Sequence, residues 1–144
     1  MRFTLLLVAF ITPLVNATEN TDWPNYANDA GSSKFAALDH INATNVQKVE
    51  VAWSWESPDN QMVKENRKLT PWGFKSTPIK IGKTLYVSTS LGHVAAISAD
   101  DGETIWKFDT KTYADGRPTN LGFNHRGVAY WSDNNQEIII MPTN

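Results

Sequence analysis

The sequence lacks cysteine altogether among its 144 residues, which excludes disulfide bonds and a lipid-modified cysteine at an export-cleavage site. Charge of either sign is also sparse. The chain carries 13 Lys and Arg against 15 Asp and Glu, a net charge of −2. Because phosphate binding requires a basic face, this balance gives no reason to expect a nucleic-acid partner.

Several signatures of enzyme chemistry are also missing from the sequence. There is no P-loop, no Rossmann glycine pattern, no zinc-ligand spacing and no serine-nucleophile elbow. Calcium requires six or more oxygen ligands, and no cluster of that kind is recognisable. His40 and His93 have no companions at metal-ligand spacing, so we interpret both as structural or exposed.

The longest apolar run stands at the N-terminus. Met1 and Arg2 precede an apolar stretch over 3–15, and Val15-Asn16-Ala17 fits a small-residue cleavage site. The stretch is shorter than the ~20 residues that a membrane-spanning helix needs. It therefore predicts a signal peptide over residues 1–17 and a periplasmic product with no transmembrane segment in the mature chain. A buried apolar strand or helix is the alternative.

Short β-rich runs separated by glycine-containing turns characterise the second half of the chain. Such turns require positive φ and join neighbouring antiparallel strands. They predict a four-stranded meander followed by the first two strands of another unit. The expected strands are Thr77–Ile81, Thr84–Thr89, His93–Ser98, Thr104–Phe108, Gly127–Trp131 and Glu137–Met141.

The first half carries fewer signals. Asn42 or Thr44 is placed to cap a short helix through Val46 and Val49. Val49–Trp55 alternates as a strand but has no hairpin partner before it, and the charges and prolines of Ser57–Trp72 make regular structure there unexpected.

The fold class predicted from this pattern is all-β. Consecutive meanders suit a sandwich, a barrel or a propeller, but the two units begin 51 residues apart, which favours propeller blades. The strand at Val49–Trp55 would then complete a sheet whose other strands come from the far end of the ring. A blade needs neighbours on both faces, so we expect the chain to be the N-terminal part of a larger propeller.

The third turn of the meander carries a more specific motif. Ala96, Gly102 and Trp106 stand at positions 1, 7 and 11 of the pattern Ala-x-Asp-x-x-Thr-Gly-x-x-x-Trp, with Ser98 and Asp101 replacing its Asp and Thr. This resembles the tryptophan-docking repeat of the quinoprotein dehydrogenases, the eight-bladed propellers that bind pyrroloquinoline quinone. Trp in that repeat lies on the glycine backbone of the next blade.

Further segments in the same order extend the resemblance over nearly all of the mature chain. They are Asp22 to Tyr26, Asp29, Gly31, Phe35 to Asp39, Ile41-Asn42, Asn45-Val46, Ala52-Trp53, Thr77 to Ile79, Leu85 to Val87 and His125 to Trp131.

The resemblance implies a partial quinoprotein propeller domain over residues 18–144: an N-terminal strand, one four-stranded blade and the start of the next. It implies an enzyme that oxidises an alcohol, polyol or sugar with pyrroloquinoline quinone as hydride acceptor, passing electrons to an unidentified cytochrome or ubiquinone. The Ca²⁺ ligands and the catalytic Asp of such enzymes are expected outside this chain, which alone should be inactive. A cofactor-free scaffold of the outer-membrane assembly type is the alternative.

Three residues are candidates for cofactor binding. Lys75 stands two residues before Thr77 and Arg126 two residues before Val128, near the start of the first strand of each meander, which predicts equivalent positions at one mouth of the central channel. Arg126 matches an Arg that contacts the cofactor in the resembled family, whereas Lys75 replaces a Glu. A guanidinium pairs with a carboxylate or polarises a quinone oxygen, and an ammonium acts as a point charge. His125 adjoins Arg126 and is the third candidate.

The segment before Arg126 also departs from one branch of the family. Alcohol-oxidising relatives carry adjacent cysteines there, where this chain has Asn120-Leu121, which favours the sugar- or polyol-type branch. The loop Thr110–Phe123 is long enough to be functional or to form a rim.

Overall fold

The structure is a computed structural model, and it describes residues 22–143. The predicted signal peptide over residues 1–17 lies outside the described residues. In chain order, the elements are η1 (Val46–Lys48), α1 (Asp59–Glu65), η2 (Arg67–Leu69), β1 (Ile79–Ile81), β2 (Thr84–Ser88), β3 (His93–Ser98), β4 (Thr104–Asp109), η3 (Thr112–Asp115), β5 (Ala129–Ser132) and β6 (Glu137–Ile140).

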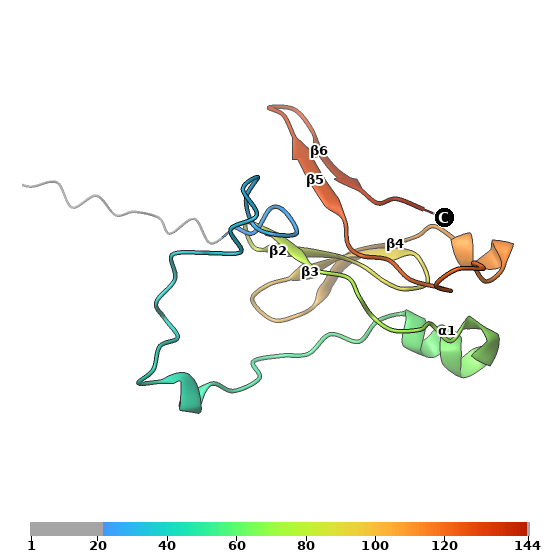
Figure 1. Ribbon diagram of the computed structural model, residues 1–144, viewed down its shortest axis with the longest axis horizontal. Helices are drawn as coiled ribbons and strands as arrows, with labels where there is room; N and C mark the ends of the chain where they lie inside the picture. The colour runs from blue at the N-terminus through green and yellow to red at the C-terminus, as the bar shows by residue number, and fades with distance from the viewer. Residues whose placement is uncertain (1–21, 144) are drawn as a thin grey trace, which may run out of the picture.

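Strands β1 to β4 form one antiparallel sheet in the order β1-β2-β3-β4, which confirms the predicted meander (Figure 1). Its register aligns Ile79 with Tyr86, Tyr86 with Ala96, and Ala96 with Trp106 across the four strands. Because side chains alternate along each strand, these four residues share one face of the sheet. The pairing of β3 with β4 shifts at Ala96/Ile97, next to the turn that carries Gly102.

The opposite face of this sheet carries the apolar core. Val87, Ala95 and Ile97 are buried there, and Trp53 and Trp55 pack against them. The N-terminal segment therefore covers one face of the meander, a contact that the sequence did not predict, and residues 49–55 are not a strand in this structure. Residues 49–55 find no partner strand among the described residues, and an extended backbone without a ladder of hydrogen bonds is not a strand.

The two tryptophans fix this segment by their side chains. The Trp53 Nε1–H donates to the Ala99 carbonyl at 3.2 Å, and the Trp55 Nε1–H donates to Thr104 Oγ1 at 2.9 Å. The Trp53 ring lies on Gly102, where a Cβ would stand 2.5 Å from a ring carbon. Gly102 of the docking motif thus receives a tryptophan from the segment before the meander.

Helix α1 contradicts the prediction that Ser57–Trp72 lacks regular structure. The helix begins after Pro58, which has no backbone N–H to leave unpaired, and places Asp59 in its first turn. Asp59 is also its one buried residue. Because no apolar stripe marks this helix, its docking depends on a polar side chain that hydrophobic periodicity does not detect.

The helix predicted near Val46 exists as a single 3₁₀ turn, η1. Asn45 is its N-cap residue, with no side-chain cap hydrogen bond, and Asn42 Oδ1 instead accepts from the Thr44 N–H at 3.0 Å.

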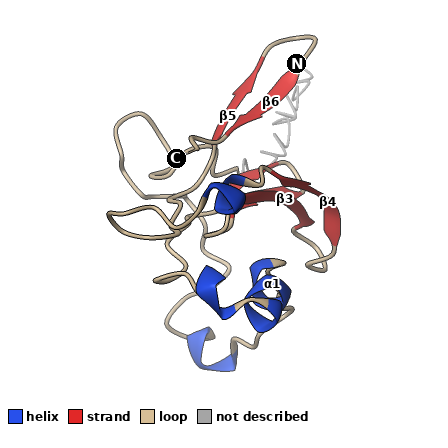
Figure 2. Ribbon diagram, turned by 90° about the vertical axis from the view of Figure 1, so that its right-hand side faces the viewer, coloured by secondary structure: helices blue, strands red, loops and turns tan. Residues whose placement is uncertain are grey.

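Strands β5 and β6 form a separate antiparallel hairpin. The hairpin and α1 lie on opposite sides of the four-stranded sheet in both views (Figures 1 and 2). Tyr86 and Tyr130 stack across the gap between sheet and hairpin, with ring centroids 6.4 Å apart. No helix within residues 22–143 is long and apolar enough to cross a membrane.

Candidate functional site

An open pocket of about 540 Å³ lies where β1 and β5 begin. Both predicted cations line it, together with Tyr26, Thr77, Val128 and Ile140. Lys75 and Arg126, each of which precedes the first strand of its unit, therefore lie on one pocket. Their function as cofactor ligands stays a prediction.

The backbone around Arg126 is held against the start of the four-stranded sheet. The Thr77 N–H donates to the Arg126 carbonyl at 3.2 Å, and Thr77 pairs with Gly127 in a parallel bridge. Gly127 has φ +140°, and a Cβ on it would stand 3.0 Å from the Thr77 carbonyl oxygen. Glycine after Arg126 is thus what lets the two first strands approach closely.

The loop that carries Lys75 is tied to the end of β2 and the turn that follows. Ser76 Oγ lies 3.1 Å from Ser88 Oγ, and the Ser90 hydroxyl donates to the Gly73 carbonyl at 2.9 Å. The Lys75 ammonium lies 5.3 Å from the centre of the Trp72 ring, a cation–π distance.

The pocket is electropositive. Lys75 and Arg126 are both exposed, and neither forms an ion pair with a carboxylate within the part of the chain that the structure describes. Two unpaired cations beside apolar walls are suited to an anionic ligand with an apolar body.

His125 does not line this pocket. The side chain is buried, 7% exposed, and its ring donates a hydrogen bond to the Pro142 carbonyl. Burial lowers the pKa of His125 from its ordinary value, although the Asp59 charge and the hydrogen bond to Pro142 act in the opposite direction. His125 Nε2 would stand 3.6 Å from a Cβ on Gly92, so the ring lies beside the turn between β2 and β3 and outside the pocket lining.

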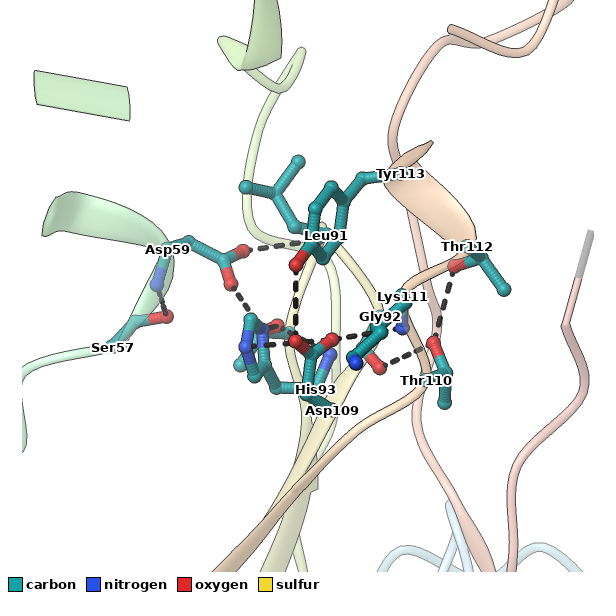
Figure 3. A network of polar contacts seen from close by, with 11 residues as sticks. Ser57, Asp59, Leu91, Gly92, His93, Asp109, Thr110, Lys111, Thr112 and Tyr113 are labelled. Carbon is teal, nitrogen blue, oxygen red and sulfur yellow. Dashed lines mark hydrogen bonds and ion pairs between the residues drawn. The ribbon is translucent and has the colours of Figure 1, made fainter. Parts of the chain in front are cut away.

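A buried polar network that the sequence did not predict lies at the same end of the sheet (Figure 3). His93 Nδ1 is 3.2 Å from Asp59 Oδ1, and His93 Nε2 is 3.7 Å from Asp109 Oδ1. Asp59 Oδ2 also accepts from the Leu91 N–H at 2.9 Å. Tyr113 donates to Asp109 Oδ2 at 3.0 Å and stacks on the His93 ring.

The network joins helix α1 to the turn between β2 and β3. Burial would raise the pKa of Asp59, but hydrogen bonds from His93, Thr89 and the Leu91 N–H outweigh burial and lower it. Asp59 is thus held as a carboxylate. His93, interpreted from the sequence as structural or exposed, is structural. The pairing of His93 with Asp109 across β3 and β4 was readable from the hairpin register, whereas Asp59 lies 34 residues away.

Comparison with known proteins identifies the family. Residues 23–144 match the family described as the PQQ glucose/ethanol/alcohol dehydrogenase β-propeller domain. The chain belongs to this family. It is 33% identical over 129 residues, 90% of the chain, to the quinate/shikimate dehydrogenase (quinone) of Acinetobacter baylyi. It is 31% identical, over 81% of the chain, to the quinoprotein glucose dehydrogenase of Escherichia coli.

A solved quinoprotein-family structure shares this fold. The crystal structure of quinohemoprotein alcohol dehydrogenase from Comamonas testosteroni superposes on 81% of the chain with a TM-score of 0.59 and 32% identity. The matched region is 16% of that protein. The chain likewise spans only 14–15% of the length of the curated relatives described above.

Proposed function

We propose that this chain is the N-terminal part of an eight-bladed, pyrroloquinoline quinone-dependent dehydrogenase that oxidises an alcohol, polyol or sugar in the periplasm. Family membership and relatives named as glucose, alcohol and quinate/shikimate dehydrogenases support the reaction class. The observation that carries the proposal is the convergence of Arg126 and Lys75 in one pocket where β1 and β5 begin.

The residues of this pocket fit the cofactor. Pyrroloquinoline quinone is a planar tricarboxylate, and the pocket offers a guanidinium, an ammonium and the apolar side chains of Val128 and Ile140. Its volume of about 540 Å³ falls within the ordinary range for small-molecule sites. When bound, the quinone supplies a two-electron acceptor for oxidation of a CH–OH group.

In this proposal Arg126 anchors the quinone, and Lys75 contributes positive charge where relatives carry a Glu. The chain supplies one wall of the site. No cluster of three or more acidic, His or Cys side chains suited to a metal occurs within residues 22–143. We therefore assign the Ca²⁺ ligands and the catalytic base to parts of the enzyme other than these residues, and we expect the chain alone to be inactive.

Equilibrium dialysis of the 144-residue chain against pyrroloquinoline quinone tests the proposal. Arg126→Gln removes charged hydrogen bonds and should weaken binding at least tenfold. Arg67→Gln, which removes an exposed arginine outside the pocket, should leave the affinity unchanged. The assigned site would be refuted if the wild-type chain showed no saturable binding of the quinone. It would also be refuted if wild type and Arg126→Gln bound the quinone with equal affinity.

Two further measurements test the expected inactivity of the chain and its proposed location. Dye-linked turnover by residues 18–144 with quinone and Ca²⁺ would contradict the expected inactivity. Fractionation of cells expressing the full chain should recover it in the periplasm, and recovery in the cytoplasm would contradict the proposed location.

A further inference from the structure

The segment around Trp23 is attached to β1, an edge strand of the four-stranded sheet. Trp23 and Lys80 exchange two backbone hydrogen bonds of 2.9 Å, which add Trp23 to the free side of β1. Asp22 Oδ1 accepts from the Gly82 N–H at 2.8 Å at the far end of the same strand. Three hydrogen bonds therefore fix the position of Asp22 and Trp23 against β1, and with it the direction of the segment that follows Trp23.

This attachment brings Tyr26 to the pocket. The Trp23 Nε1–H donates to the Tyr26 carbonyl at 3.4 Å, and the Asn28 N–H donates to the Asn25 carbonyl at 3.0 Å, which closes a tight turn around the residue. Tyr26 lines the pocket together with Lys75 and Arg126, which follow it in the sequence by 49 and 100 residues.

Several large aromatic residues among residues 22–143 are exposed, and Tyr26 is the one of them that lines the pocket. Its residue surface is 66% exposed, although it borders a cavity, and the Lys34 ammonium lies 5.9 Å from its ring centre. Large aromatic side chains that remain exposed beside a cavity gain from covering by a flat partner. The adjacent charges of Lys75 and Arg126 restrict that partner to an anion.

We propose that Tyr26 is a ligand-binding residue of this pocket, with its ring packed against a planar aromatic polycarboxylate whose charges pair with Lys75 and Arg126. The inference rests on the proposed function, in which pyrroloquinoline quinone is that ligand. It adds a binding contact from the N-terminal segment to the two cations predicted from the sequence.

The test measures binding of pyrroloquinoline quinone and of citrate, a tricarboxylate without a ring, to variants of the full chain. Tyr26→Ala should weaken quinone binding about five- to tenfold, since aromatic contacts contribute at that level beyond area burial, and should leave citrate binding unchanged. Tyr26→Phe, which keeps the ring, should bind the quinone within about twofold of wild type. Phe35→Ala is the matched control, because Phe35 is also 66% exposed and lies outside the pocket lining.

The outcomes separate this inference from the proposed function. If Arg126→Gln weakens quinone binding and Tyr26→Ala does not, the inference fails and the proposed function stands. Equal loss of quinone and citrate binding in Tyr26→Ala also overturns it, because the residue would then shape the pocket without contacting a ring. If Arg126→Gln has no effect, the proposed function itself fails. Should Tyr26→Ala not fold, Tyr26→Leu, which keeps side-chain bulk without an aromatic ring, decides by the same criteria.

Discussion

Replacing Asp59 with alanine would remove the carboxylate through which helix α1 holds the β2–β3 turn. Leu91 is 1% exposed, so its N–H would be left buried without an acceptor, at a cost of about 1–3 kcal/mol. Loss of the carboxylate contact to His93 adds about 1 kcal/mol, because His93 keeps Asp109 and Thr89 as neighbours. The expected loss in free energy of unfolding is about 3 kcal/mol, a large part of the 5–15 kcal/mol typical of a domain.

Urea unfolding followed by tryptophan fluorescence measures this loss. Asn60→Ala is the control, since Asn60 is the exposed neighbour of Asp59 on the same helix and should change stability by less than about 0.5 kcal/mol. Hydrogen exchange at the Leu91 amide gives a local readout and should accelerate in Asp59→Ala. Unchanged Leu91 exchange, or equal stability of the two variants, would refute the assigned role of the carboxylate.

The pH dependence of this effect follows from the lowered pKa of Asp59. A carboxylate whose folded pKa is below its unfolded value of 3.8 stabilises the protein fully above pH 3.8, and the contribution is lost as pH falls through the folded value. The stability gap between wild type and Asp59→Ala should therefore be constant near neutrality and narrow in acid. A gap that persists unchanged well below pH 3.8 would contradict the hydrogen-bonding assignment.

Two other perturbations test the packing around the site. Gly102→Ala should destabilise by about 1–3 kcal/mol in chemical denaturation, because the residue has φ +79° and the new Cβ meets the Trp53 ring, whereas Gly73→Ala, with open space around it, should be near neutral. Equal effects of the two substitutions would contradict the docking contact. His125 has a pKa lowered by burial, so its neutral form stabilises the fold fully above 6.5 and this contribution decreases as pH falls below 6.5. His125→Gln should flatten that part of the stability–pH curve, and an unaltered slope would exclude His125 as its source.

Much of the sheet was predictable because its determinants are local. Alternation within β2 and β3 and the glycine turns located the four strands to within two residues, with β3 placed at His93–Ser98 as predicted. Residues 49–55 alternate in the same way, but they pair with no strand among residues 22–143. Alternation there marks a surface that packs by Trp53 and Trp55, but strand formation also requires a partner backbone.

Some residues of the pocket were predictable from the sequence and others were not. Lys75 and Arg126 were expected together because each precedes the first strand of its unit, and the structure places both on one pocket. Tyr26 carried no comparable signal. Its position depends on the Trp23–Lys80 bridge, which joins segments 57 residues apart.

The sequence by itself determined the docking motif, the meander and the likeness to quinoprotein dehydrogenases. It also determined that a cation, Lys75 or Arg126, precedes the first strand of each unit. Each of these features depends on turns and on alternation patterns that span only a few residues. Only the tertiary structure decided that His125 is buried outside the pocket lining, that Tyr26 borders the pocket, and that Asp59 joins α1 to His93. These are side-chain meetings between distant segments, and their geometry exists only once the sheet, the helix and the N-terminal segment have packed.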